Sequence, residues 1–365
     1  MTNLEQLINV SHLFGRNKEY VIAGGGNTSF KDEHSIWVKA SGTSLADIDE
    51  DGFVCLSRNL LKQIATSTYS SNAQEREEQV KNDLYKAIIS TNGKRPSVET
   101  SMHEVIDYAF VVHTHPTLIN SLMCSVKSEE VACDLFPEMS IYVGYTDPGY
   151  VLFKKVDDAI RLFKQRNKYC PKIIFLQNHG VFVASDSIDE ITSIYEKLAN
   201  VLLAKLSESL PDLILYSENC EMATKIINEK FKKSVVYQSD NLTKQFIQSD
   251  KSFAKVASPF TPDQIVYCKS NYLFVESEDQ LVKAIESFVT INNYLPKIIA
   301  IKGKALFAME DSEKSAQIAI DVFTDGMKIA YLSMSFGGPH AMTAEQISFI
   351  DNWEVENYRR KVAKS

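Results

Sequence analysis

The stretch FVVHTHP, residues 110–116, decides the fold prediction, and the rest of the chain is placed around it. Its aromatic and β-branched residues predict a buried β-strand that the proline terminates. His113 and His115 are two residues apart, and side chains at that spacing point to the same face of a strand. Both imidazoles can therefore converge on one point. A third imidazole and an open position would complete the arrangement of a catalytic zinc site.

A second stretch, PKIIFLQNHG at residues 171–180, predicts another buried strand. His179 stands at the end of this strand and is the candidate third ligand. A single strand histidine is more often an ordinary polar residue, so the metal interpretation depends on the three occurring together. Glu99 lies four residues before His103, so both face the same side of a helix start. Glu99 is a candidate fourth ligand or general base, whereas His103 is interpreted as a structural or supporting residue.

Three short segments offer groups that can hold a phosphate. In GGGNTSF, residues 24–30, the glycines can expose backbone N–H groups, and Asn27 and Thr28 add side-chain donors. SGTS at residues 41–44 and PS at residues 96–97 offer the same chemistry. The spacings GxxxxGK[ST] and GxGxxG do not occur in these segments, so no nucleotide fingerprint applies. Each segment alone is more often a turn, but three near strand ends or a helix start could surround one phosphate.

The composition narrows the classes of function. The chain has 365 residues and a formal net charge of −8, which argues against a protein that binds duplex nucleic acid. No run approaches the roughly 20 apolar residues that a membrane helix needs. The N-terminus has no basic segment typical of a secretory signal, and the six scattered cysteines form no CxxC pair. We therefore expect a cytoplasmic protein that binds neither nucleic acid nor membrane.

A repeat links two parts of the chain. The sequence PKII at residues 171–174 recurs at residues 296–299, an offset of 125. At this offset His179 is paired with Lys304. The repeat predicts a strand–strand–helix unit used twice, with the metal-ligating residue type missing from the second copy.

The repeat and the change in composition divide the chain into three expected parts. Residues 1–206 contain the histidine and phosphate motifs and are expected to form the catalytic domain. Residues 207–256 are more polar and lack a clear motif, so a linker or peripheral helices are expected there. Residues 257–365 are expected to form a smaller α/β unit, a degenerate partial repeat without metal.

The motifs together resemble one family. Their order and spacing over about residues 1–205 are similar to those of the class II aldolase/adducin family. The C-terminal part resembles the aldolase half of bifunctional rhamnulose-1-phosphate aldolase/dehydrogenases in three segments, 260–263, 297–312 and 353–356. Because the sequence ends at Ser365 without a GxGxxG motif, no dehydrogenase half is expected. The motifs of the main resemblance are Gly25-Gly26-Asn27-Thr28-Ser29, Val38-Lys39-Ala40-Ser41-Gly42, Pro96-Ser97-Val98-Glu99 with His103, His113-Thr114-His115-Pro116, Pro148-Gly149 and Asn178-His179-Gly180.

The resemblance implies a fold, a cofactor and an assembly. The fold is a three-layer α/β/α sandwich with a mostly antiparallel central sheet, and the family often forms homo-oligomers. The implied cofactor is Zn²⁺, or another divalent metal, held by His113, His115 and His179. Glu99 matches the catalytic carboxylate of the family, a base that also approaches the metal.

The resemblance also assigns substrate contacts and shows two departures. Four residues match positions that hold the substrate phosphate, namely Asn27, Ser41, Gly42 and Ser97. Val98 replaces a serine of the usual motif and removes one hydroxyl donor. The tyrosine acid of the family has no clear match, and Tyr145 or Tyr142 is the candidate substitute.

The expected activity is a zinc-dependent aldolase reaction. It would cleave a phosphorylated ketose similar to rhamnulose 1-phosphate into dihydroxyacetone phosphate and a lactaldehyde-like aldehyde. A sugar-phosphate epimerase, dehydratase or decarboxylase on the same fold is an alternative. A non-catalytic adducin-like binding module is another alternative, which the three intact histidines disfavour.

Overall fold

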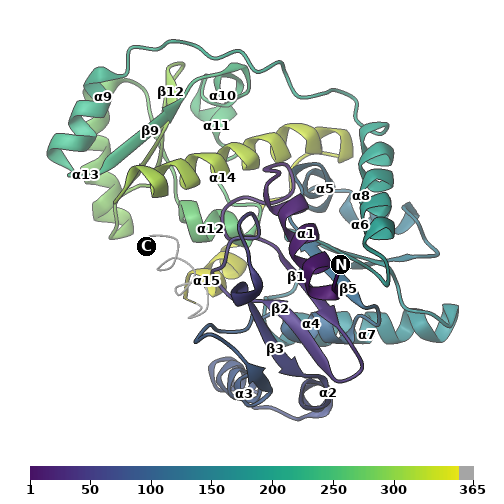
Figure 1. Ribbon diagram of the computed structural model, residues 1–365. Helices are drawn as coiled ribbons and strands as arrows, with labels where there is room; N and C mark the ends of the chain where they lie inside the picture. The colour runs from purple at the N-terminus through teal and green to yellow at the C-terminus, as the bar shows by residue number, and fades with distance from the viewer. Residues whose placement is uncertain (353–365) are drawn as a thin grey trace. The chain divides into compact units, whose positions relative to one another are not determined.

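The computed structural model describes residues 1–352, and the chain folds into two compact units (Figure 1). Unit 1 consists of residues 1–123 and 127–204. Unit 2 consists of residues 124–126 together with the chain from Lys205 onward.

An eight-stranded sheet forms the middle of unit 1, in the order β4-β3-β2-β1-β5-β8-β7-β6. Neighbouring strands are antiparallel except β6 and β7, which are parallel. The strand expected in FVVHTHP is β5, and it lies inside the sheet with β1 and β8 on its two edges. The strands are β1 (Asn27–Lys31), β2 (Ser35–Lys39), β3 (Phe53–Ser57), β4 (Ile88–Ser90), β5 (Phe110–Thr114), β6 (Ser140–Val143), β7 (Ile173–Leu176) and β8 (Gly180–Ser185).

Helices cover both faces of this sheet. On one face, α2, α3, α4 and α7 pack in a buried core with strand residues such as Val38, Val111 and Phe182. On the other face, α1 and α8 pack on the central strands, and the hydroxyl of Tyr195 on α8 lies 2.7 Å from that of Thr114. The expected three-layer α/β/α sandwich with a mostly antiparallel sheet is confirmed. The helices are α1 (Asn3–Gly15), α2 (Arg58–Thr66), α3 (Ala73–Lys86), α4 (Thr100–Val105), α5 (Thr117–Met123), α6 (Ser128–Asp134), α7 (Tyr150–Asn167) and α8 (Ile188–Leu203), with the 3₁₀ turn η1 (Glu50–Gly52).

Unit 2 contains a four-stranded sheet in the order β10-β11-β12-β9. Strands β10 and β11 are parallel, and the other neighbours are antiparallel. Its core includes Val275, Ile285 and Phe307. The segment 207–256, where a linker or peripheral helices were expected, contributes β9 to this sheet. The elements are α9 (Glu221–Lys225), η2 (Ile226–Lys230), β9 (Ser234–Gln238), α10 (Asn241–Phe246), α11 (Asp250–Phe253), α12 (Pro262–Cys268), β10 (Leu273–Val275), η3 (Glu278–Gln280), α13 (Leu281–Asn292), β11 (Ile298–Ile301), β12 (Ala305–Glu310), α14 (Glu313–Leu332), η4 (Ser333–Phe336) and α15 (Ala344–Asn352).

The two sheets share one arrangement of four strands. In unit 2 the order β9-β12-β11-β10 repeats the order β5-β8-β7-β6 of unit 1, with the same strand directions. The hairpin register also repeats at the offset of 125, because Ile174 pairs with Phe182 and Ile299 pairs with Phe307. The offset in the sequence therefore corresponds to a structural repeat of half of the larger sheet.

Two further observations concern membrane helices and the C-terminal segment. None of the helices within residues 1–352 is both long enough and apolar enough to span a membrane. The segment 353–356, which contributed to the family resemblance, lies outside the described residues.

Candidate metal centre

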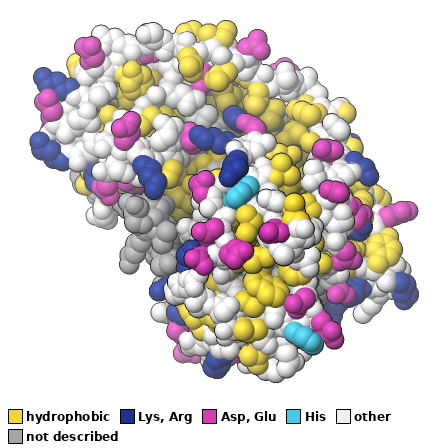
Figure 2. Space-filling model, in the orientation of Figure 1, with side chains coloured by type: hydrophobic (Ala, Val, Ile, Leu, Met, Phe, Trp, Pro, Cys, Tyr) yellow, Lys and Arg dark blue, Asp and Glu magenta, His cyan; other side chains and the backbone are white. Residues whose placement is uncertain are grey.

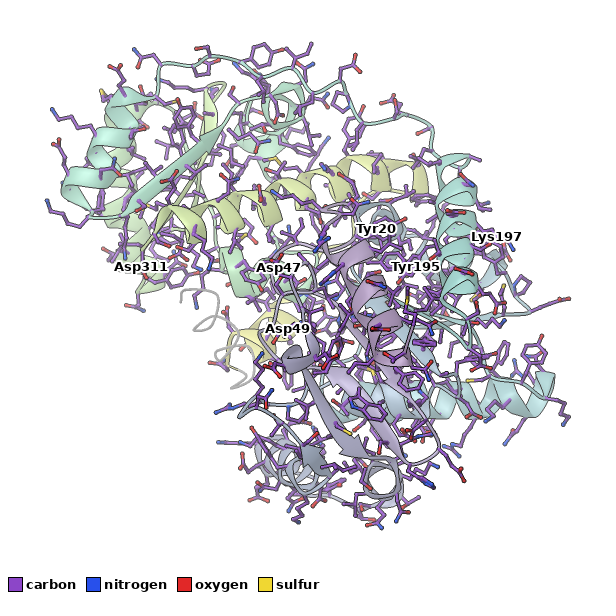
Figure 3. The ribbon with its side chains drawn as sticks, in the orientation of Figure 1. Tyr20, Asp47, Asp49, Tyr195, Lys197 and Asp311 are labelled. Atoms are coloured by element: carbon purple, nitrogen blue, oxygen red, sulfur yellow. The ribbon has the colours of Figure 1, made fainter. Side chains whose placement is uncertain are left out.

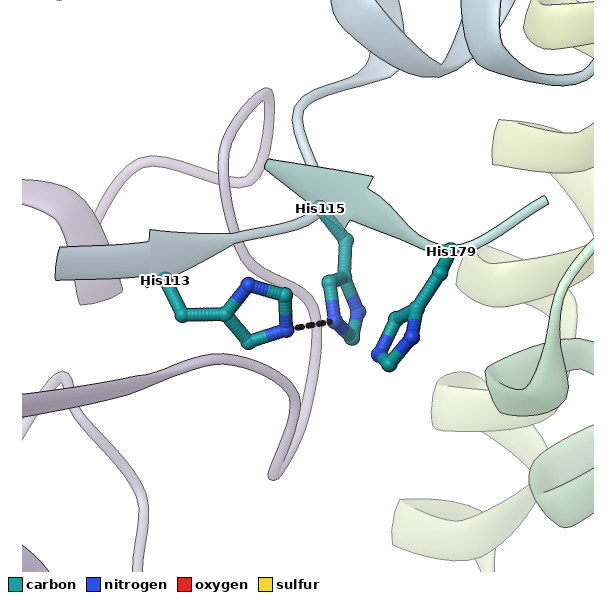
Figure 4. Close-up of side chains that lie close together, drawn as sticks. All are labelled: His113, His115 and His179. Carbon is teal, nitrogen blue, oxygen red and sulfur yellow. Dashed lines mark hydrogen bonds between the residues drawn. The ribbon is translucent and has the colours of Figure 1, made fainter. Parts of the chain in front are cut away.

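His113, His115 and His179 meet at one point in unit 1 (Figure 4). His113 lies on β5, His115 directly follows this strand, and His179 lies in the turn between β7 and β8. Their ligand nitrogens all lie within 4.8 Å of one another, and the Nε2 atoms of His113 and His115 are 3.0 Å apart. The spacing of two residues on a strand and the histidine at a strand end thus bring three imidazoles together.

The tight turn before β8 depends on Gly180. A side-chain carbon at this position would lie 2.5 Å from the carbonyl oxygen of Thr114 and 2.7 Å from Cδ2 of His115. Glycine therefore allows β5 and β8 to approach closely at this point. Asn178 in the same turn has a φ of 53°, a left-handed conformation that asparagine tolerates. The Asn-His-Gly sequence is what sets His179 beside His115.

Contacts behind the imidazoles fix their orientation. Nδ1 of His113 lies 3.0 Å from the carbonyl oxygen of Val181, and its ring stacks on Phe182 with centroids 4.1 Å apart. Burial lowers the pKa of His113 well below its usual range. Nδ2 of Asn120 on α5 donates to the carbonyl oxygen of His179 at 3.2 Å. With Nδ1 of His113 donating to a carbonyl, its Nε2 is the atom left to ligate a metal.

Glu99 places a carboxylate beside the imidazoles. Its Oε1 lies 3.4 Å from Nε2 of His113 and 3.4 Å from Nε2 of His179. This oxygen is buried and has no hydrogen-bond partner. Burial raises the pKa of Glu99, but the imidazoles and a hydrogen bond from Asn27 together lower it more, and the pKa lies at about 2. The side chain is therefore an ionised carboxylate at neutral pH.

The second oxygen of Glu99 is held by Asn27. Nδ2 of Asn27 donates to Oε2 of Glu99, and Oδ1 of Asn27 contacts Nε2 of His103. Nδ1 of His103 in turn lies 2.7 Å from Oγ of Ser29. Asn27, expected at the phosphate, thus uses one of its two side-chain N–H groups and its amide oxygen inside the protein. Ser29 was expected only as part of the glycine-rich segment that could hold an anion, and its position two residues after Asn27 on β1 places both side chains on one face.

Two segments expected to hold a phosphate are joined beside Glu99. The N–H of Ser41 donates to the carbonyl oxygen of Arg95 at 2.9 Å. Oγ of Ser97 accepts a hydrogen bond from the N–H of Glu99 at 3.2 Å. Gly42 has a φ of 80°, a conformation that favours glycine. Ser41, Gly42 and Ser97 are therefore brought into one neighbourhood.

Lys39, which the sequence analysis gave no separate role, joins the third segment to this neighbourhood. Its side chain is buried at the end of β2, and Nζ donates to the carbonyl oxygens of Thr43 at 2.7 Å and Gly24 at 3.3 Å. The signal available in the sequence was a lysine within the apolar run IWVKA, residues 36–40, where a buried charged side chain needs a partner.

Thr28 is not brought to this group of residues. It lies between Asn27 and Ser29 on β1, so its side chain faces the opposite side of the sheet. Its fully buried hydroxyl lies 2.6 Å from that of Ser11 on α1. Because this hydroxyl faces another layer of the sandwich, Thr28 does not lie with the other residues that were expected to contact the phosphate.

Tyr145, the candidate acid, lies next to the turn between β7 and β8. Its N–H donates to Oε1 of Gln177 in that turn at 2.9 Å. Burial and the nearby carboxylate of Asp147 raise the pKa of Tyr145 above its usual range, so its hydroxyl stays protonated at neutral pH. The hydroxyl of Tyr142, the other candidate, lies 3.0 Å from that of Ser128.

The donor set around Glu99 fits a divalent cation. Three imidazole nitrogens and a carboxylate oxygen are ligands that Zn²⁺ takes in catalytic sites. The ionised Oε1 of Glu99 is buried without a partner, which is a costly arrangement that a cation would relieve. Within residues 1–352, these three histidines form the cluster whose ligand atoms lie close enough together to hold a metal ion.

The matching position in unit 2 carries other residues. The shared register aligns His113 with Tyr237 and, two residues further on, His115 with Ser239. The third ligand position holds Lys304, whose Nζ pairs with a glutamate at 2.5 Å. Zinc sites of proteins use imidazole, thiolate or carboxylate ligands, and a phenol, an alcohol or an ammonium group does not replace them. The strand arrangement that carries the site is thus repeated in unit 2 without the metal-ligating residues.

Comparison with known proteins supports the assignment of unit 1. A family model described as Class II Aldolase and Adducin N-terminal domain matches residues 5–205. That range contains every residue discussed for the metal and phosphate sites.

Three relatives are similar to parts of the chain. The chain is 26% identical over 208 residues to the uncharacterized oxidoreductase YuxG of Bacillus subtilis, covering 54% of this chain and 28% of that protein. It is 29% identical over 138 residues to a methylthioribulose-1-phosphate dehydratase of Leptospira biflexa, covering 36% of this chain and 54% of that protein. It is 23% identical over 217 residues to an L-fuculose phosphate aldolase of Methanococcus maripaludis, covering 56% of this chain and 99% of that protein. The chain thus spans less than two thirds of the first two of these relatives.

Proposed function

Because this chain belongs to the class II aldolase and adducin family, we propose that it is a metal-dependent lyase that cleaves a phosphorylated ketose. The single observation that carries this proposal is the position of Glu99. Its ionised and unpaired Oε1 lies 3.4 Å from Nε2 of both His113 and His179. A carboxylate in that position can take a proton from a substrate that is bound against the three imidazoles.

The three histidines would hold the metal ion, with Zn²⁺ as the proposed metal. A divalent cation there supplies a Lewis acid that polarises the oxygens of the substrate. His115 and His179 are partly exposed, whereas His113 is fully buried. The substrate would therefore approach from the side of His115 and His179, because His113 closes the inner side.

Glu99 is proposed to start the cleavage. Its Oε1 accepts the proton of the hydroxyl group that lies two carbons from the ketone. The electron pair left on that oxygen forms the carbonyl of the aldehyde product, and the carbon–carbon bond next to it breaks. The electrons of this bond remain on the carbon beside the ketone, which then takes the proton from Glu99 to give dihydroxyacetone phosphate. A lactaldehyde-like aldehyde is the second product, and Tyr145 is the proposed residue whose hydroxyl donates a hydrogen bond to the oxygen that becomes its carbonyl.

The phosphate group is proposed to lie at Ser41, Gly42 and Ser97, with the remaining N–H of Asn27 at its edge. Ser97 is held directly beside Glu99, since its Oγ accepts from the N–H of Glu99. A phosphate in this place would be fixed by hydroxyl and amide donors and would need no cluster of basic residues. This matches a chain whose formal net charge is −8.

A dehydratase is the second candidate, since one relative is a methylthioribulose-1-phosphate dehydratase with 29% identity over 138 residues. The same carboxylate would then take the proton from the carbon beside the ketone. The hydroxyl group two carbons from the ketone would leave as water. The two reactions differ only in which proton Glu99 accepts, so the products distinguish them.

The proposal extends to the other parts of the chain. Residues 1–206 would carry the chemistry. The copy without metal would include β9 of the segment 207–256 together with the described part of residues 257–365. The enzyme is proposed to act as a homo-oligomer in the cytoplasm. All six cysteines are free, which is typical of a reducing compartment.

Metal content and product analysis test the proposal. Purified protein is expected to hold a divalent metal, and His113→Ala is expected to lose it. His34→Ala, an exposed histidine in the turn between β1 and β2, serves as the matched control and should retain the metal. Incubation with rhamnulose 1-phosphate and fuculose 1-phosphate should release dihydroxyacetone phosphate. Equal metal content in wild type and His113→Ala would remove the metal centre, and release of water without an aldehyde would favour the dehydratase.

A further inference from the structure

We propose that His103 is a positioning residue that sets the amide of Asn27, and through it the carboxylate of Glu99, in one fixed orientation. The proposal rests on the proposed function, in which Glu99 is the base. It concerns a histidine that is not a member of the metal-binding group. Four side chains carry it, those of Ser29, His103, Asn27 and Glu99.

The direction of each hydrogen bond follows from chemistry. An ionised carboxylate only accepts hydrogen bonds, so Asn27 must present its Nδ2 to Oε2 of Glu99. Oδ1 of Asn27 then faces His103, and Nε2 of His103 must donate to it. A neutral imidazole that donates through Nε2 accepts through Nδ1, so the hydroxyl of Ser29 donates to Nδ1 across 2.7 Å. The chain therefore has one polarity, from the hydroxyl to the carboxylate.

Burial removes the alternatives that solvent would offer. Ser29 and His103 are fully buried, and Asn27 is only 4% exposed. The ring of His103 lies edge-on to Phe182 with centroids 5.3 Å apart. Nζ of Lys31 donates to the carbonyl oxygen of His103 and holds its backbone. Burial also lowers the pKa of His103 to about 3, so the ring is neutral at the pH of the experiments below.

The distance between the two residues on β1 is similar to the distance between the two residues at the start of α4. Asn27 and Ser29 are two residues apart on β1, which places their side chains on one face about 6.6 Å apart. Glu99 and His103 are four residues apart at the start of α4, a rise of about 6 Å along the helix. The side chains of strand and helix can therefore alternate in one line. This alternation is a built arrangement and not a chance contact of two polar groups.

The consequence falls on the two oxygens of Glu99. Oε2 is held by Asn27, so Oε1 is the oxygen that remains free beside His113 and His179. Without the N–H of His103, the amide of Asn27 could turn over and present its oxygen to the carboxylate. Two acceptors would then face each other, and the carboxylate would rotate away from its position. His103 thus acts on the reaction through Asn27 and touches neither metal nor substrate.

The first test reads the tautomer directly and needs neither metal nor substrate. Metal-free protein with ¹⁵N-labelled histidine is examined at pH 7 by long-range ¹H–¹⁵N correlation, and His103→Gln identifies the signals. The expected pattern shows a protonated Nε2 and an unprotonated Nδ1. A proton on Nδ1, or on both nitrogens, would overturn the proposal. In Ser29→Ala the donor to Nδ1 is lost, so the ¹⁵N shift of Nδ1 should change while Nε2 stays protonated, because Asn27 still accepts its proton; an unchanged Nδ1 shift would contradict the chain.

The second test separates positioning from structural support. His103→Met fills a similar volume without a donor, and kcat should fall by about 10- to 100-fold, the range found when a supporting residue of a metal site is lost. His103→Gln retains a donor and an acceptor and should recover part of kcat. KM and metal content should stay at wild-type values in both. Equal kcat in the two variants, or a change confined to KM, would contradict a positioning role.

The two tests distinguish a failure of this inference from a failure of the proposed function. His12→Met is the matched control, since His12 lies on α1 and its Nε2 contacts the carbonyl oxygen of Ile48 at 2.7 Å. It should leave kcat and the His103 signals unchanged. If wild-type protein cleaves no ketose phosphate, the proposed function fails, and the tautomer alone then decides the hydrogen-bond chain. If His103→Met does not fold, the Gln and Ser29→Ala variants decide it.

Discussion

The hairpins β7–β8 and β11–β12 have the same backbone plan and different chemistry. Both turn through a residue with left-handed backbone, Asn178 with a φ of 53° and Gly303 with a φ of 63°. Both lead into a helix whose N-cap serine, Ser187 or Ser312, accepts a hydrogen bond from a backbone N–H. Yet one turn carries His179 and the other carries Lys304. Backbone register and turn geometry therefore do not require the metal ligands.

The comparison also shows where the remaining groups of the site come from. Unit 1 continues its sheet from β5 to β1, and Asn27 and Ser29 lie on that extra strand. Glu99 and His103 lie at α4, which packs on the same half of the sheet. The described part of unit 2 has four strands and repeats only the half from β5 to β8. A metal centre of this kind needs both halves, since one supplies the imidazoles and the other supplies the base and its support.

Exchanging the differing turn residues gives the largest expected effect. His179→Lys makes the turn of unit 1 like that of unit 2, and metal binding and turnover should both be lost. The loss of turnover should exceed about 100-fold, because a ligand is removed and not merely a supporting residue. Metal analysis and release of dihydroxyacetone phosphate measure it. The reverse change, Lys304→His, should gain no metal, because Tyr237 and Ser239 occupy the other two positions; a second bound metal would break the comparison.

The base should matter only in unit 1. Glu99→Gln keeps the shape of the side chain but cannot accept the substrate proton, so kcat should fall by about 10²- to 10⁴-fold. Metal content should persist because the three histidines remain. Glu278→Gln in unit 2, which affects the partner of Lys304, is the matched control and should leave kcat unchanged. Normal turnover in Glu99→Gln would take the role of base away from this residue.

The paired phenylalanines test the shared frame. Phe182 and Phe307 are both fully buried and are related by the offset of 125. Replacing either by alanine should reduce the free energy of unfolding by about 3–5 kcal/mol. Only Phe182→Ala should also weaken metal binding, because Phe182 stacks on His113 at 4.1 Å. Urea denaturation and metal titration measure the two effects, and equal metal affinity in both variants would deny Phe182 a part in the site.

A pH effect should accompany His103. Its pKa in the folded protein is about 3, below the value of about 6.5 in an unfolded chain, so the unfolded state binds the proton more tightly. Its contribution to stability is therefore full above pH 6.5 and declines as the pH falls toward 3. Between pH 6.5 and 5 the loss should be roughly 1.5 kcal/mol. Stability of metal-free wild type and His103→Gln over this range measures it, and parallel curves would contradict a neutral buried ring.

The smallest effect is expected at the turn of unit 2. Lys304 pairs with Glu278, and their side chains are 23% and 16% exposed. Lys304→Ala should cost about 1 kcal/mol of unfolding free energy, more than most exposed ion pairs, because Oε1 of Glu278 is buried without a hydrogen-bond partner. Metal content and kcat should not change. A loss of metal in this variant would mean that the turn of unit 2 has more than a structural part.

Other parts of the structure show which features a sequence pattern predicts and which it does not. Figure 2 shows charged side chains of both signs spread over the visible face, with hydrophobic groups between them, as the composition suggested. Figure 3 labels Tyr195, whose hydroxyl contacts Thr114 on the face of the sheet opposite the metal site. That contact joins residues 81 positions apart, and no periodicity in the sequence announces it.

Local patterns determined a large part of this protein. Period-two spacing on one strand gave His113 and His115 a common face, and Asn178 and Gly180 gave the turn that carries His179. The offset of 125 revealed a repeated hairpin, and its register in the two units agrees. These features depend on neighbours in the chain or on strand geometry, which apolar patterning specifies strongly. Motif order was enough to indicate the family.

Tertiary structure alone decided how the candidate site is completed. Asn27 and Glu99 are 72 positions apart, and their hydrogen bond exists because β1 pairs with β5 while α4 packs over that face. The same pairing turns Thr28 to the other layer, although it stands beside Asn27 in the motif. It also gives His103 its partners. The described part of unit 2 repeats only the half of the sheet from β5 to β8. The physical reason is that strand pairing and burial fix which long-range polar groups must meet, since a buried donor or acceptor without a partner is costly.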